Sequence, residues 1–270
     1  MLRTMRLGEA DRIVTLATPE HGKVRAVAKG IRRTRSRLGS RLDPITHVSL
    51  MCWKGRELDV VTQVEVLDHF RPIREDLDRM PLAFTMLEAV DQVAVERQPM
   101  PDVFKLLVGA LRTLAGEGGA VLLGAFLWKL LALEGLHPVV DRCAHCDEDA
   151  PLTAFDVESG GFLCRECRRG QAVSGETVAL VRQILGGELR QALAAPPSKA
   201  TAEVERLATG AAEYHFERRL KSAHASALAG GTMAASRPAP ARDGPGVDPP
   251  PGGPGADPAR GGPGVEDPPD

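Results

Sequence analysis

The sequence predicts an α+β protein with a small antiparallel β-sandwich or barrel, a helical domain with a four-cysteine insertion, and a disordered tail. Three observations support this fold class. Residues 1–78 hold short β-type runs, residues 79–230 show helical periodicity, and residues 231–270 contain 11 Pro and 9 Gly in 40 positions. We therefore expect domains at 1–78 and 79–230, the insertion at 141–170, and the tail at 231–270.

Four β-type runs cover residues 12–17, 23–28, 46–53 and 58–66. The segments Glu20-His21-Gly22 and Lys54-Gly55-Arg56 close two hairpins, since glycine accepts the positive φ that tight turns often need. Short strands at this spacing are typical of a small antiparallel sandwich or barrel. We expect Cys52, which lies outside the four-cysteine segment, to be a buried strand thiol.

Helical periodicity begins near residue 81. Apolar residues recur with helical spacing across 82–97, 103–114 and 119–136, and again across 174–185 and 201–221. Ala195-Pro196-Pro197 separates the last two helices. The most apolar run, 118–136, is interrupted by Lys129 and Glu134. The uncharged part of this run is only about half as long as the roughly 20 residues that a helix needs to cross a bilayer. The run therefore predicts a buried core helix.

The charge is unevenly distributed. The chain has 34 Lys+Arg and 36 Asp+Glu, yet residues 1–56 carry 13 basic and four acidic side chains. The net charge of the whole chain therefore does not indicate a polyanion partner. The positive charge of residues 1–56 does indicate one. The opening residues mix charged and apolar side chains and lack the apolar stretch of an export signal. We expect a cytoplasmic protein with no membrane partner.

Two Cys-x-x-Cys pairs carry the most specific chemical signal. They are Cys143 with Cys146 and Cys164 with Cys167, separated by 17 residues. Each pair suits a tight knuckle, and four thiolates complete a tetrahedron around one structural Zn²⁺ with no open position for water. A redox dithiol, the competing interpretation, needs only one pair. We expect His145 to be exposed and not a ligand.

Basic residues surround the cysteines and fill a second segment. Those near the cysteines either offset thiolate charge or touch nucleic acid; they are Arg142, Arg165, Arg168 and Arg169. The second segment has eight positive charges and no acid, and it is a candidate sequence-independent DNA-binding site or a solvated basic face. Its residues are Lys23, Arg25, Lys29, Arg32, Arg33, Arg35, Arg37 and Arg41.

Aromatic support for that DNA site is weak. If the sheet is an oligonucleotide-binding barrel, the basic loop lies beside the groove that holds single strands. Trp53 is the only aromatic residue before Phe70, and a core position explains it. We expect backbone electrostatics to dominate over base stacking.

No motif of a common enzyme class is present. The sequence lacks a Gly-x-x-x-x-Gly-Lys phosphate loop, Gly-x-Gly-x-x-Gly, His-Glu-x-x-His and Gly-x-Ser-x-Gly. A zinc hydrolase needs an open coordination position, which four cysteines do not leave. We therefore expect no catalytic residues and no enzymatic activity.

Several segments together resemble the bacterial RecO family of recombination mediators. They are 2–16, Glu20-His21-Gly22-Lys23, 26–33, Thr62-Gln63, 126–131, the four cysteines, Gly160-Gly161 and 215–222. The resemblance extends over residues 1 to about 225. It implies an N-terminal oligonucleotide-binding (OB) barrel, a helical domain and a four-cysteine zinc finger.

The same resemblance implies the function and the partners. Such proteins bind single- and double-stranded DNA, anneal complementary strands, and act with RecR to load RecA onto DNA coated by single-stranded DNA-binding protein (SSB). The family recognises the acidic, apolar-ended C-terminus of SSB, which requires basic residues beside an apolar groove. Arg218, Arg219 and Lys221, on the predicted last helix near Leu207, Ala211 and Leu220, are the candidates. We expect association with the nucleoid during repair.

Two features depart from the family pattern. Family members usually have several residues ahead of the Leu2-Arg3-Thr4 stretch, so translation is expected to start upstream of Met1. The tail after Gly230 is not required by the family and is expected to be a linker. An alternative function from another class is a zinc-containing protein-interaction adaptor without direct DNA binding.

Overall fold

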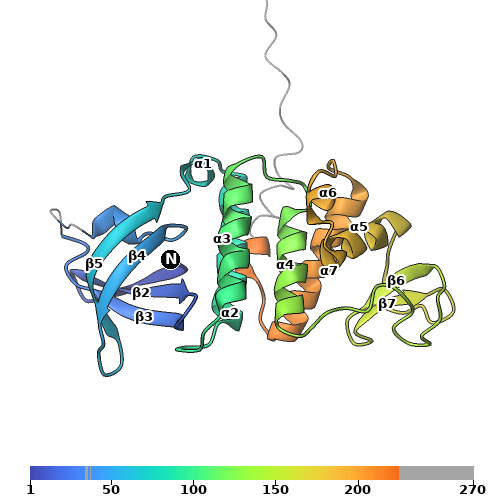
Figure 1. Ribbon diagram of the computed structural model, residues 1–270, viewed down its shortest axis with the longest axis horizontal. Coiled ribbons are helices and arrows are strands. Elements are labelled where there is room, and N and C mark those ends of the chain that lie inside the picture. Colours follow the sequence, from blue (N-terminus) through green and yellow to red (C-terminus); the bar gives the residue numbers. More distant parts are fainter. Residues whose placement is uncertain (34–35, 37, 225–270) are drawn as a thin grey trace, which may run out of the picture. The chain divides into compact units, whose positions relative to one another are not determined.

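A mostly antiparallel sheet of five strands forms the N-terminal part of the computed structural model, which describes residues 1–33, 36 and 38–224 (Figure 1). The strands lie in the order β1-β2-β3-β5-β4, and every pair is antiparallel except β3 with β5. The elements, with the 3-10 helix η1 between β3 and β4, are β1 (Arg3–Leu7), β2 (Asp11–Thr18), β3 (Gly22–Ala28), η1 (Gly39–Leu42), β4 (His47–Trp53) and β5 (Asp59–Asp68).

Apolar residues of the strands and of the segment between β3 and β4 give the sheet its own buried core. The core side chains are Val14, Leu16, Ala26, Ala28, Ile31, Leu42 and Val61. The four predicted runs are confirmed as β2, β3, β4 and β5. The predicted runs did not include β1, because its five residues are all exposed or half-buried and show no apolar alternation.

The predicted barrel is not closed. Within the described residues, β1 and β4 form no strand pair, and they remain the two edges of the sheet. Two backbone hydrogen bonds cross the gap, from Met1 N to Thr46 O at 3.0 Å and from Ile45 N to Met1 O at 3.3 Å. The N-terminal part is therefore a curled, open sheet.

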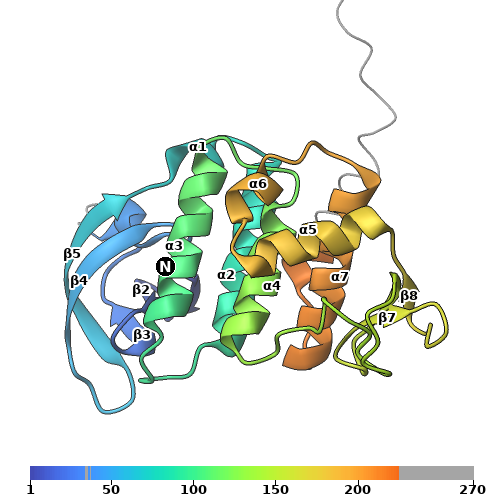
Figure 2. The ribbon, with the colours of Figure 1, turned by 45° about the vertical axis from the view of Figure 1, so that its right-hand side comes forward.

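Helices form the second part of the fold around α4. Nine of the 12 residues of α4 are buried, and it contacts α2, α3, α5 and α7, while α5 crosses α4 and α7 (Figure 2). The helices are α1 (Arg71–Arg74), α2 (Arg79–Val93), α3 (Pro101–Ala115), α4 (Leu122–Leu133), α5 (Gly175–Gly186), α6 (Leu189–Leu193) and α7 (Lys199–Phe216). In the part of the chain that the structure describes, no helix is long and apolar enough to span a membrane.

Two predicted helix ends are wrong. The helix predicted at 82–97 ends at Val93, because Val95 and Arg97 instead exchange backbone hydrogen bonds with Lys23 of β3. The helix predicted at 201–221 ends at Phe216, because Glu217 adopts a left-handed conformation with φ of 53°. Arg218 and the residues after it therefore lie beyond α7.

A small three-stranded sheet follows α4 and contains the predicted insertion. Its order is β7-β6-β8, and both pairs are antiparallel. The strands are β6 (Leu152–Asp156), β7 (Gly161–Cys164) and β8 (Gln171–Ala172). We call residues 139–172, which hold this sheet and the four cysteines, the cysteine ribbon. The predicted tail at 231–270 lies outside the described residues.

Candidate metal centre and nucleic-acid interface

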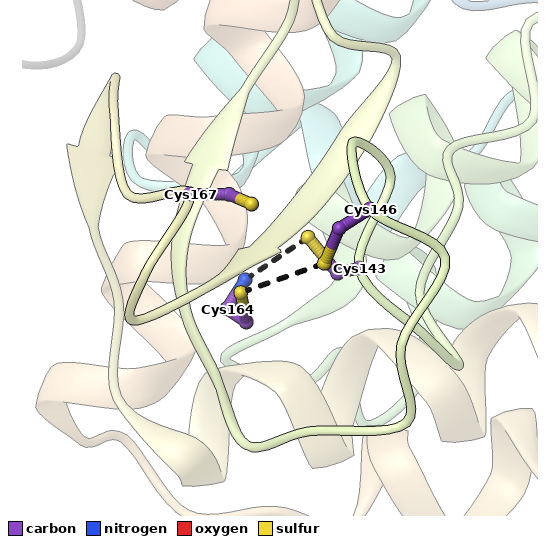
Figure 3. A group of neighbouring side chains, drawn as sticks. All are labelled: Cys143, Cys146, Cys164 and Cys167. Carbon is purple, nitrogen blue, oxygen red and sulfur yellow. Dashed lines mark hydrogen bonds between the residues drawn. The ribbon is translucent and has the colours of Figure 1, made fainter.

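Four cysteine side chains converge within the cysteine ribbon. Cys143 and Cys146 lie on a turn before β6, Cys164 ends β7, and Cys167 follows it. Figure 3 shows the four side chains pointing toward one another. The first turn is held by hydrogen bonds from Cys143 N to Glu148 O and from Asp147 N to Cys143 O, each 3.0 Å long. This turn brings both sulfurs of the first pair to the same point.

The sulfur positions fit a single tetrahedral metal ion. The four Sγ atoms lie within 4.8 Å of one another, and the Cys146 and Cys164 sulfurs are 3.8 Å apart. A Zn–S bond is about 2.3 Å long, so the sulfurs of a tetrahedral site lie about 3.8 Å apart. A disulfide bond would need a separation of about 2.05 Å. The four cysteines could therefore hold one metal ion.

The surroundings of Cys143 favour the thiolate form that metal binding requires. Burial disfavours that ionised form, but backbone N–H groups of Cys146, Cys164 and His145 hydrogen-bond the sulfur and lower the pKa of Cys143 to about 6. Burial and the neighbouring thiols raise the pKa of Cys167 to about 12. One thiolate therefore forms readily, and further thiolates at this distance need a cation.

Aromatic rings join the cysteine ribbon to the helices. The ring centroids of Trp128 on α4 and Phe155 on β6 are 5.5 Å apart, and those of Phe155 and Phe162 are 5.0 Å apart. Gly161 permits close approach of the preceding chain, because a Cβ there would lie 2.4 Å from Val139 O. Order in the ribbon is therefore coupled to the helical core.

The basic residues near the cysteines differ in their partners. Arg142 pairs with Asp147 at 2.7 Å, and Arg169 pairs with Asp156 at 3.1 Å. His145 is exposed, as predicted. Arg165 and Arg168 are also exposed, and neither has a carboxylate partner among the described residues. Arg142 and Arg169 are exposed too, so what distinguishes Arg165 and Arg168 is that no carboxylate of the described residues pairs with them.

The first two residues of the predicted DNA-binding run are paired within the protein. Lys23 Nζ lies 3.2 Å from Asp91 Oδ1 of α2 and also donates to the Asp91 carbonyl, and its side chain is 16% exposed. Arg25 pairs with Glu96 at 3.8 Å, and Arg3 of β1 pairs with Asp91 at 2.6 Å. Two carboxylates from the helical part therefore neutralise cations on the face of β1, β2 and β3.

The later residues of the run remain available. Lys29, Arg32, Arg33 and Arg41 are exposed, and none has a carboxylate partner in the part of the chain that the structure describes. Arg32 Nη1 donates to Glu9 O at 2.8 Å, which holds the segment against the β1–β2 turn. We call residues 29–41 the basic loop; the predicted Arg35 and Arg37 belong to it and lie outside the described residues.

The apolar residues predicted for the partner site near the C-terminal end of α7 are buried. Arg218, Arg219 and Lys221 are exposed, but their chain segment is tied to α2 by the Lys221 N–H, which donates to Glu88 Oε1 at 3.1 Å. The apolar residues predicted beside them are at most 3% exposed; they are Leu207, Ala211 and Leu220. These three side chains therefore offer no apolar surface for a peptide.

An apolar groove with basic residues at its rim lies elsewhere, between α3, α4 and α6. It has a volume of about 220 Å³, and Leu106, Phe126 and Leu193 are among its lining residues. Lys105 and Lys129 also line it. Sequence reasoning missed this site because its residues come from three helices, although Lys129 within the apolar 118–136 run was a signal.

Trp53 is not a core residue. Its side chain is 76% exposed at the end of β4, so the core explanation of this residue is wrong. Cys52, the preceding residue, is half-buried, and burial followed by the charge of Asp59 raises the pKa of its thiol. The alternation of β4 places these two side chains on opposite faces of the sheet.

The curled sheet, the helices and the cysteine ribbon define a multi-part α+β protein with a candidate metal centre and a basic loop. The N-terminal model of Recombination protein O matches residues 1–70, and its C-terminal model matches residues 74–224. The chain belongs to the RecO family, as its sequence resemblance indicated. Membership supports a mediator role in DNA repair and recombination, with DNA and recombination proteins as partners.

Proposed function

We propose that this protein binds single- and double-stranded DNA and anneals complementary strands. The observation that carries the proposal is the basic loop, whose Lys29, Arg32, Arg33 and Arg41 are exposed without carboxylate partners in the described part of the chain. Crowded cations repel one another, and phosphates relieve that repulsion while releasing counterions. In this proposal the open, curled sheet presents the basic loop to the DNA, as an OB fold presents its nucleic-acid-binding loops.

Annealing requires no bond to be broken. Two polyanions must be neutralised so that their bases can meet, and a cationic surface supplies this without catalytic side chains. We therefore propose a non-enzymatic mechanism. The cations that have no carboxylate partner after folding neutralise the DNA phosphates. Lys23 contributes little to this neutralisation because Asp91 already pairs with it, and the same holds for Arg25 and Glu96.

The metal is one structural Zn²⁺ held by Cys143, Cys146, Cys164 and Cys167 in this proposal. A fit between the observed 3.8 Å sulfur separation and a zinc tetrahedron supports it. When bound, the ion offsets the charge of the thiolates. The cysteines then fix the ribbon against Phe155 and the helical core.

We propose RecR and SSB as protein partners, with loading of RecA onto SSB-coated strands as the outcome. The groove between α3, α4 and α6 suits an acidic peptide with an apolar end, because Lys105 and Lys129 line a mostly apolar cavity. Lys105 also lies 3.5 Å from the Asp102 carboxylate, so Lys129 contributes more of the net positive charge. A Lys105→Ala, Lys129→Ala variant is expected to bind the SSB C-terminal peptide more weakly than wild type. The Arg218→Ala, Arg219→Ala, Lys221→Ala protein tests the site predicted from sequence. If only the triple variant lost binding of the SSB peptide, the assignment of the peptide to the groove would be overturned.

Gel shift and annealing assays test the proposal against the adaptor alternative. The purified protein is expected to shift a 20-nucleotide oligo(dT) (dT20) and a 20-base-pair duplex at low salt, and to speed annealing of complementary oligonucleotides. Copurification with RecR tests the partner. Absence of any shift at low salt, with RecR and SSB binding intact, would favour the adaptor without direct DNA binding.

A further inference from the structure

Trp53 at the end of β4 is largely exposed to solvent. Its indole is 76% exposed, whereas that of Trp128, the other tryptophan of the chain, is 1% exposed. Met51, two residues earlier on β4, is 60% exposed on the same face, since side chains alternate along a strand. The protein thus presents an aromatic ring and a thioether to solvent side by side.

The turn after Trp53 has a defined geometry. Gly55 N donates to Asp59 Oδ1 at 3.1 Å, and a Cβ at residue 55 would lie 1.9 Å from Leu58 O, so glycine is required there. Arg97 also contacts Asp59 Oδ1, at 3.5 Å. Figure 1 shows this turn at the end of the β4–β5 hairpin. The indole is therefore displayed from a preorganised hairpin.

Exposed cations lie in the turn that follows Trp53. Lys54 and Arg56 follow Trp53 in the turn, are exposed, and have no carboxylate partner within the described ranges, although the turn also holds the exposed acid Glu57. Arg41 of the basic loop contacts the neighbouring strand β5, where its Nη1 donates to Val64 O at 3.5 Å. Val64 pairs with Leu50, the residue before Met51.

The opposite region of the sheet is less suited to a nucleic acid. OB folds hold single strands on the face of their second and third strands and on the loops between strands 1–2 and 4–5. On the first of these surfaces, Lys23 and Arg25 of β3 form ion pairs with Asp91 and Glu96. Phosphates gain less from cations that already have carboxylate partners. A strand attracted to unpaired cations is directed to the basic loop and the β4–β5 hairpin.

We propose that an unpaired DNA base stacks on the indole of Trp53 while the neighbouring phosphates contact Lys54, Arg56 and the basic loop. This inference rests on the proposed DNA-binding function and adds strand selectivity to it. Every base has a π-face, so stacking is tolerant of sequence. Bases inside a duplex already stack on each other, so Trp53 contributes to binding of single strands only.

Three ligands separate stacking from electrostatics. They are dT20, an abasic 20-mer with the same number of phosphates, and a 20-base-pair duplex. Trp53→Ala is expected to weaken dT20 binding roughly 5- to 150-fold, the effect of losing one base–aromatic stack. Trp53→Phe, the matched control, should retain most of the affinity. Binding of the abasic strand and of the duplex should not change, nor should the salt dependence.

Fluorescence gives a second measurement, because the chain has only two tryptophans with very different exposure. Saturating dT20 is expected to quench the emission of wild type but not that of Trp53→Phe, in which only Trp128 emits. Unchanged dT20 affinity in Trp53→Ala, with unquenched emission of DNA-bound wild type, overturns the stacking site. Failure of wild type to bind dT20 overturns the proposed function itself.

Discussion

Replacing Cys164 with Ser removes one of four sulfur ligands and tests whether the ribbon depends on a metal. Four side chains packed in the ribbon become vulnerable; they are Leu152, Phe155, Phe162 and Leu163, all at most 7% exposed. At about 1.5–3 kcal/mol each, their burial amounts to about 6–12 kcal/mol, an upper bound. Losing a third of it, about 2–4 kcal/mol, lowers the melting temperature by about 4–16 °C.

The assay combines metal content with stability. Wild type should hold one Zn²⁺ per chain, and Cys164→Ser much less, together with the fall in melting temperature. In a Trp53→Phe background, emission should shift to the red, since Trp128 packs on Phe155 and becomes more exposed. Cys52→Ser is the matched control, because Cys52 lies outside the cluster. One zinc per chain in Cys164→Ser would refute the four-cysteine assignment.

Two further predictions concern stability. The hydrogen bond from Thr177 leads the causes that lower the pKa of the buried Glu203 carboxyl, so its stabilisation is present above the unfolded-state pKa and lost as pH falls through the folded-state pKa. Glu203→Gln should therefore lose about 1–3 kcal/mol of unfolding free energy at pH 7 and progressively less as pH falls below the unfolded-state pKa of about 4.3; a loss that does not change with pH contradicts this. Gly161→Ala places a Cβ 2.4 Å from Val139 O, so thermal melts should show a loss above about 1 kcal/mol. Gly186→Ala, whose Cβ meets nothing within 4 Å, should be neutral or stabilising, and equal melting temperatures for the two variants argue against the close contact.

Local patterns made parts of this structure predictable from sequence. The Cys-x-x-Cys spacing favours two sulfurs on one turn, and short β-type runs separated by turn residues identified β2, β3, β4 and β5. Helical spacing likewise identified α4 as a buried helix. In each case, residues close in sequence supply the signal.

Other features depend on residues far apart in sequence. Lys23 and Arg25 are ordinary members of a basic run until folding brings Asp91 and Glu96 to them. The exposure of Trp53 depends on which face of β4 the helices and the basic loop leave uncovered. Backbone hydrogen bonds between β3 and the segment after α2 also explain why α2 ends about one turn before the predicted residue 97. Such tertiary effects leave no periodic signal.

In the proposed function, unpaired cations of the basic loop bind DNA phosphates. Lys29→Gln, Arg32→Gln and Arg33→Gln together remove three of them, all exposed. A control variant removes three exposed cations from the helical part, through Arg112→Gln, Arg190→Gln and Lys199→Gln. Both variants change the net charge equally, so a difference between them reports location and not total charge.

The most direct measurement is the dT20 affinity of these proteins between about 50 and 300 mM salt. For single strands, each phosphate contact contributes about 0.7 to the slope of log affinity against log salt, so three lost contacts flatten it by about 2.1. We expect this flattening and slower annealing in the loop variant, with the wild-type slope and zinc content retained in the control. A loop variant with the wild-type slope, or equal flattening in both variants, would show that the basic loop is not the DNA-binding site.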